Sequence, residues 1–283
     1  MNQRPKLKEV SADIPSPKDI TRVYCVANNK GGVGKTTSVL ALAEAKAMAG
    51  FNVLVIDLDA TAVLTVHLGI DRTELQRDIS DVLLEISKLS EVIITGSIPG
   101  IDVAPSCARL RQQERTISAK NFGGELQLLL AIQSLDKHYD YIFIDTPPNS
   151  DTLVRIGVVA TAATGVGGVI LPCQSEFYAL LGLRDIMDVV LSYRGKLDRF
   201  LPPDCPVMGP YPRIVGVLPT MAAERQKLTR NVIAAISKVE CPLLPTIPRS
   251  VKIGESIASG RSIIGYAPDA APARAYIQVA EVL

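Results

Sequence analysis

Tryptophan is absent from this 283-residue chain, and aromatic residues make up only 5% of it, which disfavours binding of nucleic acid by stacking bases on exposed rings. A large charge of one sign is missing too. The 30 Lys and Arg residues face 29 Asp and Glu residues, a formal net charge of +1. This balance excludes a strongly basic nucleic-acid coat and an acidic tail. The 5 cysteines lie far apart without CxxC spacing, which predicts reduced thiols rather than a disulfide framework.

Signals for secretion or membrane insertion are also missing. Residues 1–20 are polar, contain three prolines and lack an apolar segment, so we expect a flexible arm there. The uncharged stretch 156–175 has the length of a membrane span, but its glycines and proline favour a helix end, a turn and a buried strand. No basic residue follows Arg274, which disfavours a basic amphipathic helix on a membrane. We therefore expect a cytoplasmic protein without a membrane partner.

Short β-branched runs alternate with helical patterns along residues 21–283. The runs are at 23–27, 53–57, 101–104, 141–145, 166–171 and 214–218, with a weaker one at 243–247. Because these runs are continuously apolar, they are typical of strands covered on both faces. Helical patterns occupy 37–49, ending at Gly50, and 125–138, and a proline-rich surface loop is expected at 201–212. The second helical pattern places the following leucines near one face: Leu126, Leu129, Leu130 and Leu135. The alternation predicts an α/β fold, a mostly parallel sheet with helices on both faces, forming one domain over 21–283.

A glycine-rich segment, NNKGGVGKTT at residues 28–37, joins the first strand to the first helix. Strand, glycine-rich turn and helix are the context of a phosphate-binding loop, where backbone N–H groups and the helix dipole hold an anion. We expect Lys35 to reach the β- and γ-phosphates of a nucleotide and the Thr36 hydroxyl to ligate Mg²⁺. The nucleotide-binding candidates are Gly31, Gly32, Val33, Gly34, Lys35, Thr36 and Thr37.

Acidic residues end two of the predicted strands. Asp57 and Asp59 follow the second strand at the edge where open α/β sheets bind ligands. Asp145 ends the apolar run YIFID, a Walker B pattern whose carboxylate binds Mg²⁺ through water. Thr36 and Asp145 are therefore metal candidates, and a helix N-cap or loop carboxylate is one interpretation of Asp57.

The segment KGGVGKTT resembles the deviant Walker A motif of the ParA/MinD family of ATPases. The strict pattern GxxxxGK[ST] fails because Asn29 stands at its first glycine, and Lys30 adds a second lysine. The resemblance implies that Lys30 reaches the partner's phosphates in a nucleotide-sandwich homodimer, and that Asp59 orients the attacking water while Asp57 supports the Mg²⁺ shell. The catalytic candidates are thus Lys30, Lys35 and Asp59, acting on ATP with Mg²⁺.

The resemblance extends through blocks at 170–182 and 215–252, so it covers about residues 21–283. The chain departs from the family after Asp59, where Ala60 and Thr61 replace the usual Pro and Gln. How tightly this segment, which acts as a switch in the family, senses the γ-phosphate therefore stays open. His67 is expected to be a partly exposed helix residue rather than a base. Four residues match the region around adenine in relatives: Thr220, Met221, Pro248 and Arg249.

Nucleotide chemistry is shared across the family, so other features must indicate the biological role. Scattered cysteines disfavour an iron–sulfur carrier, and only Tyr266 and Tyr276 stand near the end, which disfavours a tyrosine-kinase relative. Between Arg213 and Arg261, eight basic residues outnumber three acidic ones. A dimer would double that surface and contact many DNA phosphates, the alternative being ordinary solvated faces. The DNA-binding candidates are Arg225, Lys227, Arg230, Arg249 and Lys252.

These features favour a ParA-type ATPase. Such a protein binds DNA non-specifically as an ATP homodimer and positions a plasmid, a chromosome or another cargo. Its hydrolysis is stimulated by a partner such as a ParB-like centromere-binding or adaptor protein, and it is cytoplasmic and nucleoid-associated. Two alternatives stay open: a nucleotide-gated scaffold with little hydrolysis that positions a protein assembly, and a MinD-like membrane-associated ATPase.

Overall fold

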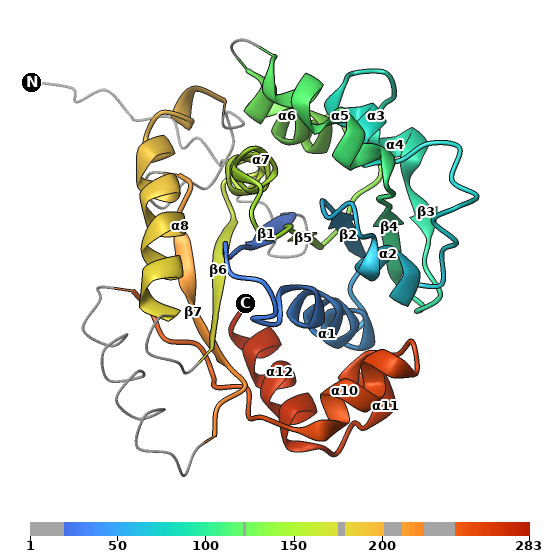
Figure 1. Ribbon diagram of the computed structural model, residues 1–283, viewed down its shortest axis with the longest axis vertical. Coiled ribbons are helices and arrows are strands. Elements are labelled where there is room, and N and C mark those ends of the chain that lie inside the picture. Colours follow the sequence, from blue (N-terminus) through green and yellow to red (C-terminus); the bar gives the residue numbers. More distant parts are fainter. Residues whose placement is uncertain (1–19, 121–122, 175–178, 201–210, 224–240) are drawn as a thin grey trace, which may run out of the picture.

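A seven-stranded sheet runs through the centre of the molecule in the order β3-β4-β2-β5-β1-β6-β7 (Figure 1). The computed structural model describes residues 20–120, 123–174, 179–200, 211–223 and 241–283. The strands are β1 (Arg22–Val26), β2 (Val53–Asp57), β3 (Ile94–Thr95), β4 (Ile101–Ala104), β5 (Tyr141–Asp145), β6 (Gly167–Gln174) and β7 (Ile214–Thr220). All neighbouring strands are parallel except β3, which pairs antiparallel with β4.

Helices cover both faces of the sheet. They are α1 (Lys35–Met48), α2 (Val63–His67), α3 (Ile79–Leu83), α4 (Leu89–Val92), α5 (Arg109–Ser118), α6 (Gln127–Gln133), α7 (Asp151–Ala160), α8 (Ala179–Tyr193), α10 (Val251–Ala258), α11 (Ile263–Tyr266) and α12 (Ala271–Val282). Helices α1, α11 and α12 pack on one face, and α3 to α8 contribute to the core on the other. None of the helices in the described residues is both long enough and apolar enough to cross a bilayer.

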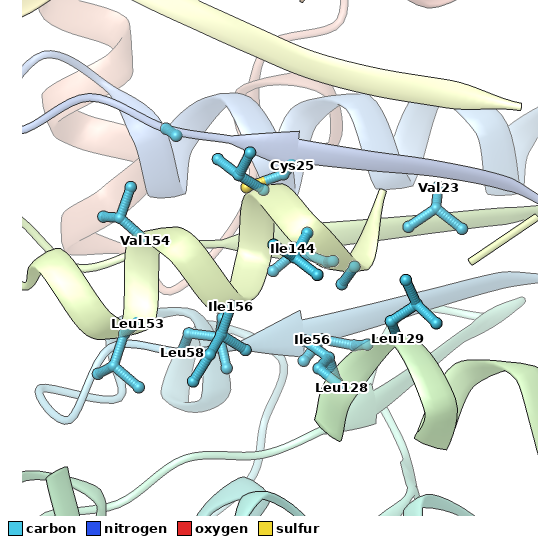
Figure 2. Packing of buried hydrophobic residues seen from close by; sticks show 14 of the residues in the cluster. Val23, Cys25, Ile56, Leu58, Leu128, Leu129, Ile144, Leu153, Val154 and Ile156 are labelled. Carbon is cyan, nitrogen blue, oxygen red and sulfur yellow. The ribbon is translucent and has the colours of Figure 1, made fainter. Parts of the chain in front are cut away.

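Alternate residues of the central strands enter two separate cores. In β2, Val53 and Val55 belong to the core under α1 and α12, whereas Leu54 and Ile56 belong to the core under α6 and α7. Figure 2 shows the second core, where Ile56 and Ile144 of the sheet lie among residues of α6 and α7. The period of two along a strand sends neighbours to opposite faces, so both faces must be apolar. This confirms the predicted α/β sheet and the reading of its continuous apolar runs.

At the edges of the sheet, one predicted strand is absent from the described residues and one strand was not predicted. No strand forms at residues 243–247, where Leu243 makes only an isolated bridge to Val217. Backbone bonds still tie this segment to β7, as from the Leu244 nitrogen to the Val217 carbonyl at 2.9 Å. The flanking Pro242 and the internal Pro245 lack the N–H that a regular ladder needs. The short antiparallel β3 was missed, because its two residues carry no periodic signal.

Of the two predicted helices, one is confirmed and the other is shorter than expected. Helix α1 is confirmed, and Gly50 after it has a φ of 87°, as a residue at the end of a helix requires. The helix expected at 125–138 is shorter, because α6 ends at Gln133, and its buried face is Leu128, Leu129 and Ile132. The predicted face was therefore partly wrong, since Leu130 is 44% exposed.

The uncharged stretch 156–175 resolves as expected into the end of α7, a turn and the buried β6. Three predicted segments lie largely or partly outside the described residues: residues 1–19 of the arm at 1–20, residues 201–210 of the loop at 201–212, and residues 175–178 of the block at 170–182.

The C-terminal helix fixes the element that carries the phosphate loop. Helix α12 packs along α1, and the Tyr276 hydroxyl lies 3.0 Å from the Ser38 hydroxyl in the second turn of α1. The Tyr24 hydroxyl of β1 donates to the carbonyl of Leu283 at 2.6 Å. The C-terminal end of the chain thus braces β1 and α1, the strand and helix on either side of the loop.

Candidate nucleotide site

The loop at residues 28–37 connects β1 to α1 at the carboxyl edge of the sheet. Gly32 and Gly34 have φ values of 74° and 91°, a left-handed conformation that disfavours side chains other than glycine. Among the described residues, no side chain caps α1 and no acidic residue stands in its first turn. The amino end of α1 therefore keeps its N–H groups and positive dipole available for an anion.

Lys35 is held inside the loop by backbone oxygens. Its Nζ donates to the carbonyls of Asn28 at 2.9 Å and Lys30 at 3.1 Å, and the residue is 6% exposed. Burial lowers the pKa of Lys35, against the opposing effect of the Asp145 and Asp59 charges. The Lys35 ammonium is bonded to neutral carbonyls, with carboxylates nearby. It can therefore move to phosphate oxygens when a nucleotide enters.

Thr36 and Asp145 form the part of the site that suits a metal. The Thr36 hydroxyl donates to Oδ2 of Asp145 at 2.7 Å. The other oxygen, Oδ1, is buried without a hydrogen-bond partner among the described residues. Burial, followed by the neighbouring Asp57 charge, raises the pKa of Asp145 well above its usual range. An unpaired buried carboxylate oxygen beside a hydroxyl fits Mg²⁺, which needs few protein ligands and keeps waters and phosphates.

Asp57 lies beside Asp145 in the sheet register but uses both oxygens on its own chain. Oδ1 accepts from the Asp59 nitrogen at 2.9 Å, and Oδ2 accepts from the Thr65 nitrogen and hydroxyl at 3.0 and 2.7 Å. Burial raises the pKa of Asp57 to about 6, and these hydrogen bonds oppose the shift. The contacts favour the loop-carboxylate alternative, because Asp57 organises the segment that carries Asp59. No group of three or more His, Cys, Asp or Glu residues suited to a metal occurs in the described ranges.

Asp59 lies half-buried between Asp57 and α2. Its Oδ1 accepts from the Thr61 nitrogen at 2.8 Å, and its charge acts on Lys35 and Asp145. His67 is only partly buried, as expected, and its ring nitrogens face the carbonyls of Val63 and Ile257.

Lys30 contacts a residue to which the sequence assigned no role. Its Nζ donates to Oε1 of Gln174, at the end of β6, at 3.1 Å. The Gln174 amide nitrogen donates in turn to the Gly32 carbonyl at 3.1 Å and to the Met221 sulfur at 3.0 Å. Gln174 thus joins the second lysine, the loop and the end of β7. The only signal for it in the sequence was its place in the family-like block at 170–182.

The four adenine-region candidates gather beside the loop at the end of β7. The Thr220 hydroxyl donates to the Val33 carbonyl at 2.8 Å, and Met221 is 39% exposed with a φ of 51°. Pro248 pairs with Ala222, whose carbonyl accepts from the Arg249 nitrogen. Segments far apart in sequence therefore meet beside the loop.

The DNA-binding candidates divide into three groups. Arg225, Lys227 and Arg230 lie outside the described residues. Arg249 is exposed, whereas Lys252 forms an ion pair with Glu255 at 2.8 Å.

Two further basic residues of that segment serve the fold. Arg213 donates to the Gly167 carbonyl at 2.7 Å, and Arg261 donates to the Gly265 carbonyl. These two guanidinium groups are therefore partly engaged within the fold.

The sheet order, the glycine loop and the Thr36–Asp145 pair together define the class of P-loop nucleotide-binding proteins. A family model described as an AAA domain matches residues 21–201. The chain is 30% identical over 262 residues to the sporulation initiation inhibitor protein Soj of Bacillus subtilis, covering 92% of this chain and 97% of that protein. It is 31% identical over 266 residues to the chromosome partitioning protein ParA of Caulobacter vibrioides, covering 92% of each. It belongs to the ParA/MinD family of P-loop ATPases.

Solved structures agree with this assignment. Cobyrinic acid a,c-diamide synthase from Mycobacterium smegmatis, with bound ADP and magnesium, is 29% identical, with a TM-score of 0.73 and 93% coverage of each chain. MinD from Pyrococcus horikoshii, complexed with Mg-ADP, is 25% identical, with a TM-score of 0.69 over 93% of this chain and 95% of that one. The family thus includes proteins with different tasks on one nucleotide-binding fold.

Proposed function

We propose that this protein is a ParA-type ATPase that hydrolyses ATP to ADP and phosphate with Mg²⁺ and positions a cargo. The observation that carries the proposal is the loop at 28–37, where Lys30, Lys35 and the Thr36–Asp145 pair come together. The magnesium and ADP bound in the Mycobacterium smegmatis relative support ATP and Mg²⁺ as its cofactors. Contacts of β1 and α1 with the C-terminal helix support treating residues 21–283 as one ATPase domain.

Each side chain has a distinct task in this proposal. Mg²⁺, held by Thr36 and Asp145, would neutralise charge on the phosphates. Lys35 leaves the Asn28 and Lys30 carbonyls for the phosphate oxygens, while Asp59 orients the water and Asp57 holds Asp59 in place. Lys30 leaves Gln174 and reaches the phosphates of a second subunit, so that ATP binding favours a homodimer.

ATP turnover tests the enzymatic part. The full chain should release phosphate from Mg–ATP faster than the Lys35→Ala variant, with DNA or a ParB-like partner raising the rate. Turnover equal to that of Lys35→Ala under every condition would refute hydrolysis.

Such a result would favour the alternative, a nucleotide-gated scaffold for a protein assembly. The altered residues after Asp59 support that alternative, because the Thr61 carbonyl is tethered by Arg72 rather than left to move freely.

DNA retention tests the partition role, which places the protein on the nucleoid in the cytoplasm. Arg249→Ala should lower DNA retention and reduce the slope of log affinity against log salt by about 1. Lys252→Ala should have less effect, since its ammonium is paired with Glu255, and Glu255→Gln should raise retention by releasing that charge. Binding that is absent with ATP, or independent of salt, would contradict this role.

A further inference from the structure

A hollow of about 520 Å³ lies beside the segment that follows Asp59. Ala60 and Thr61, which directly follow Asp59, form part of its wall. Three arginines, Arg72, Arg109 and Arg111, also line it, and its lining includes no acidic residue. Its volume falls within the roughly 300–1,000 Å³ of small-ligand sites, which is too small for a DNA duplex.

The three arginines around this hollow differ in how far their charges are neutralised. Arg109 is paired, through Nε with Asp78 at 3.2 Å and through Nη2 with Asp81 at 3.6 Å, although Nη2 is buried without a hydrogen bond to the described residues. Arg111 is exposed, and the described residues include no ion pair for it or for Arg72. Guanidinium groups present several donors in a planar fork that matches carboxylate and phosphate oxygens.

The first turn of α5 adds to this attraction for anions. Ala108, which precedes α5, provides no side-chain cap, and the turn contains two arginines and no acidic residue. The ten-residue helix therefore directs the positive end of its dipole toward the hollow that its first turn lines. An anionic group would satisfy both the arginines and the helix end.

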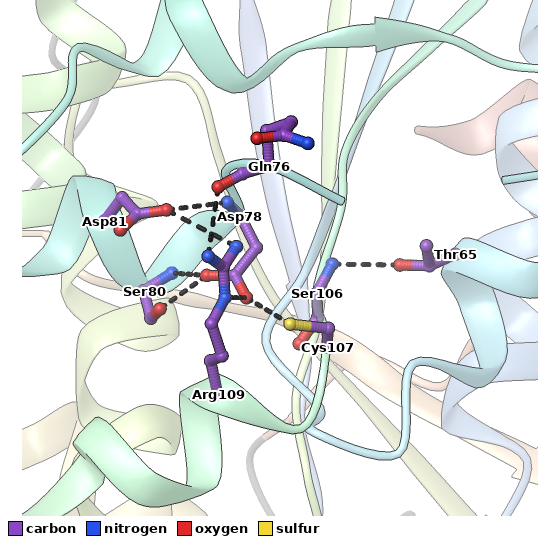
Figure 3. A network of polar contacts seen from close by, with 8 residues as sticks. All are labelled: Thr65, Gln76, Asp78, Ser80, Asp81, Ser106, Cys107 and Arg109. Carbon is purple, nitrogen blue, oxygen red and sulfur yellow. Dashed lines mark hydrogen bonds and ion pairs between the residues drawn. The ribbon is translucent and has the colours of Figure 1, made fainter. Parts of the chain in front are cut away.

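The hollow is connected to the nucleotide site by two routes. Arg72 donates directly to the carbonyl of Thr61. Figure 3 shows the second route, in which Arg109 and the Cys107 thiol both contact Oδ2 of Asp78, and the adjacent Ser106 nitrogen donates to the Thr65 hydroxyl at 3.0 Å. Thr65 is the residue that binds Asp57, so a shift at Arg109 can reach the carboxylate that holds Asp59.

We propose that this arginine-lined hollow binds a carboxylate- or phosphate-bearing ligand and that its occupancy repositions the segment at residues 57–65. The binding part stands on the hollow alone. The effect on hydrolysis rests on the proposed ATPase function. The ligand chemistry is an oxyanion, supplied either by free phosphate or by the acidic side chains of a peptide.

Calorimetry on the full chain with saturating Mg–ADP tests the binding. The probes are inorganic phosphate and acetylated hexaglutamate, added separately. At least one should bind, and Arg111→Gln should weaken that binding about tenfold or more, as loss of a charge-assisted contact predicts. The control is Arg115→Gln, an exposed arginine one turn along α5 that does not line the hollow.

Hexaglutamate binding alone assigns the site to an acidic peptide, and phosphate binding alone assigns it to a phosphate group. Binding of neither probe, or equal loss in Arg111→Gln and Arg115→Gln, overturns the proposal. Amide hydrogen exchange over residues 57–65 tests the coupling without hydrolysis. Exchange there should slow when the bound probe is added to the wild type but not to Arg111→Gln, and unchanged exchange in the wild type overturns the coupling. Failure of ATP turnover would leave both readouts intact, so it is distinguishable from failure of this inference.

Discussion

Ionisation of Asp57 should make the nucleotide-free protein less stable as the pH rises. Its pKa in the folded protein is about 6, above the ordinary 3.8, because burial opposes the charge. The folded state therefore holds the proton more tightly than the unfolded state does. The resulting stabilisation is fully present below pH 3.8 and is lost as the pH rises through about 6. At about 1.4 kcal/mol per pH unit, the ionised carboxylate costs the folded state about 3 kcal/mol.

The Asp57→Asn variant removes this cost and, with it, the contribution of the Asp57 charge to the raised pKa of Asp145. Its lost or altered hydrogen bonds are the same at every pH, so they cancel when stabilities at two pH values are compared. Urea unfolding at pH 4.5 and pH 7.5, with EDTA and without nucleotide, should show Asp57→Asn gaining roughly 2 kcal/mol on the wild type between the two conditions. Asp136→Asn, which removes an exposed carboxylate, is the matched control. A pH dependence identical in the wild type and Asp57→Asn would refute the reasoning.

Three further changes test the site and the fold. Gln174→Leu should tighten ATP-driven self-association up to about fivefold in light scattering. The reason is that Lys30 loses a hydrogen bond of about 1 kcal/mol that holds it on its own subunit. The same gain in a Lys30→Ala background would contradict the role given to Lys30. Thr36→Val should weaken calorimetric binding of ADP more with Mg²⁺ than with EDTA, since it removes the hydroxyl beside Asp145; equal losses would argue against Thr36 as a metal ligand. Gly167→Ala should lower the unfolding free energy by about 3 kcal/mol or more, because its Cβ would lie 2.0 Å from the Val23 carbonyl at a φ of 117°. The control is Gly254→Ala in the open face of α10, which should be neutral or stabilising. Similar effects of the two substitutions would show that the close contact is unimportant.

Most of the sheet was predictable because its signals are local. Continuous apolar runs mark β2 and β5, and both strands agree with the predicted bounds. The segment at 243–247 was misjudged, since its apolar residues resemble a strand while its prolines prevent a ladder. The face of α6 was misjudged because the helix ends earlier than its pattern, which shifts the buried positions to Leu128 and Ile132.

In the candidate site too, contiguous residues could be predicted from the sequence, whereas contacts between distant residues could not. The glycine loop, Lys35 and Thr36 are contiguous, so spacing alone places them at the amino end of a helix. The neighbour of Lys30 was not foreseeable, because Gln174 is 144 residues away and meets it only through the pairing of β6 with β1. The contacts of Asp57 were not foreseeable either, because the bonds from Thr65 to one of its oxygens depend on how the segment after β2 folds back.

The sequence alone thus determined the phosphate-loop motif and the family. Both depend on short stretches of the chain, since a phosphate loop needs only glycines, a lysine and a hydroxyl at close spacing. The tertiary structure decided how those groups are held: Lys30 on Gln174, Asp57 on Thr65, and three arginines around the segment that follows Asp59. The physical reason is the strand order, which brings β2, β5, β1 and β6 together and makes neighbours of residues that are distant in the chain.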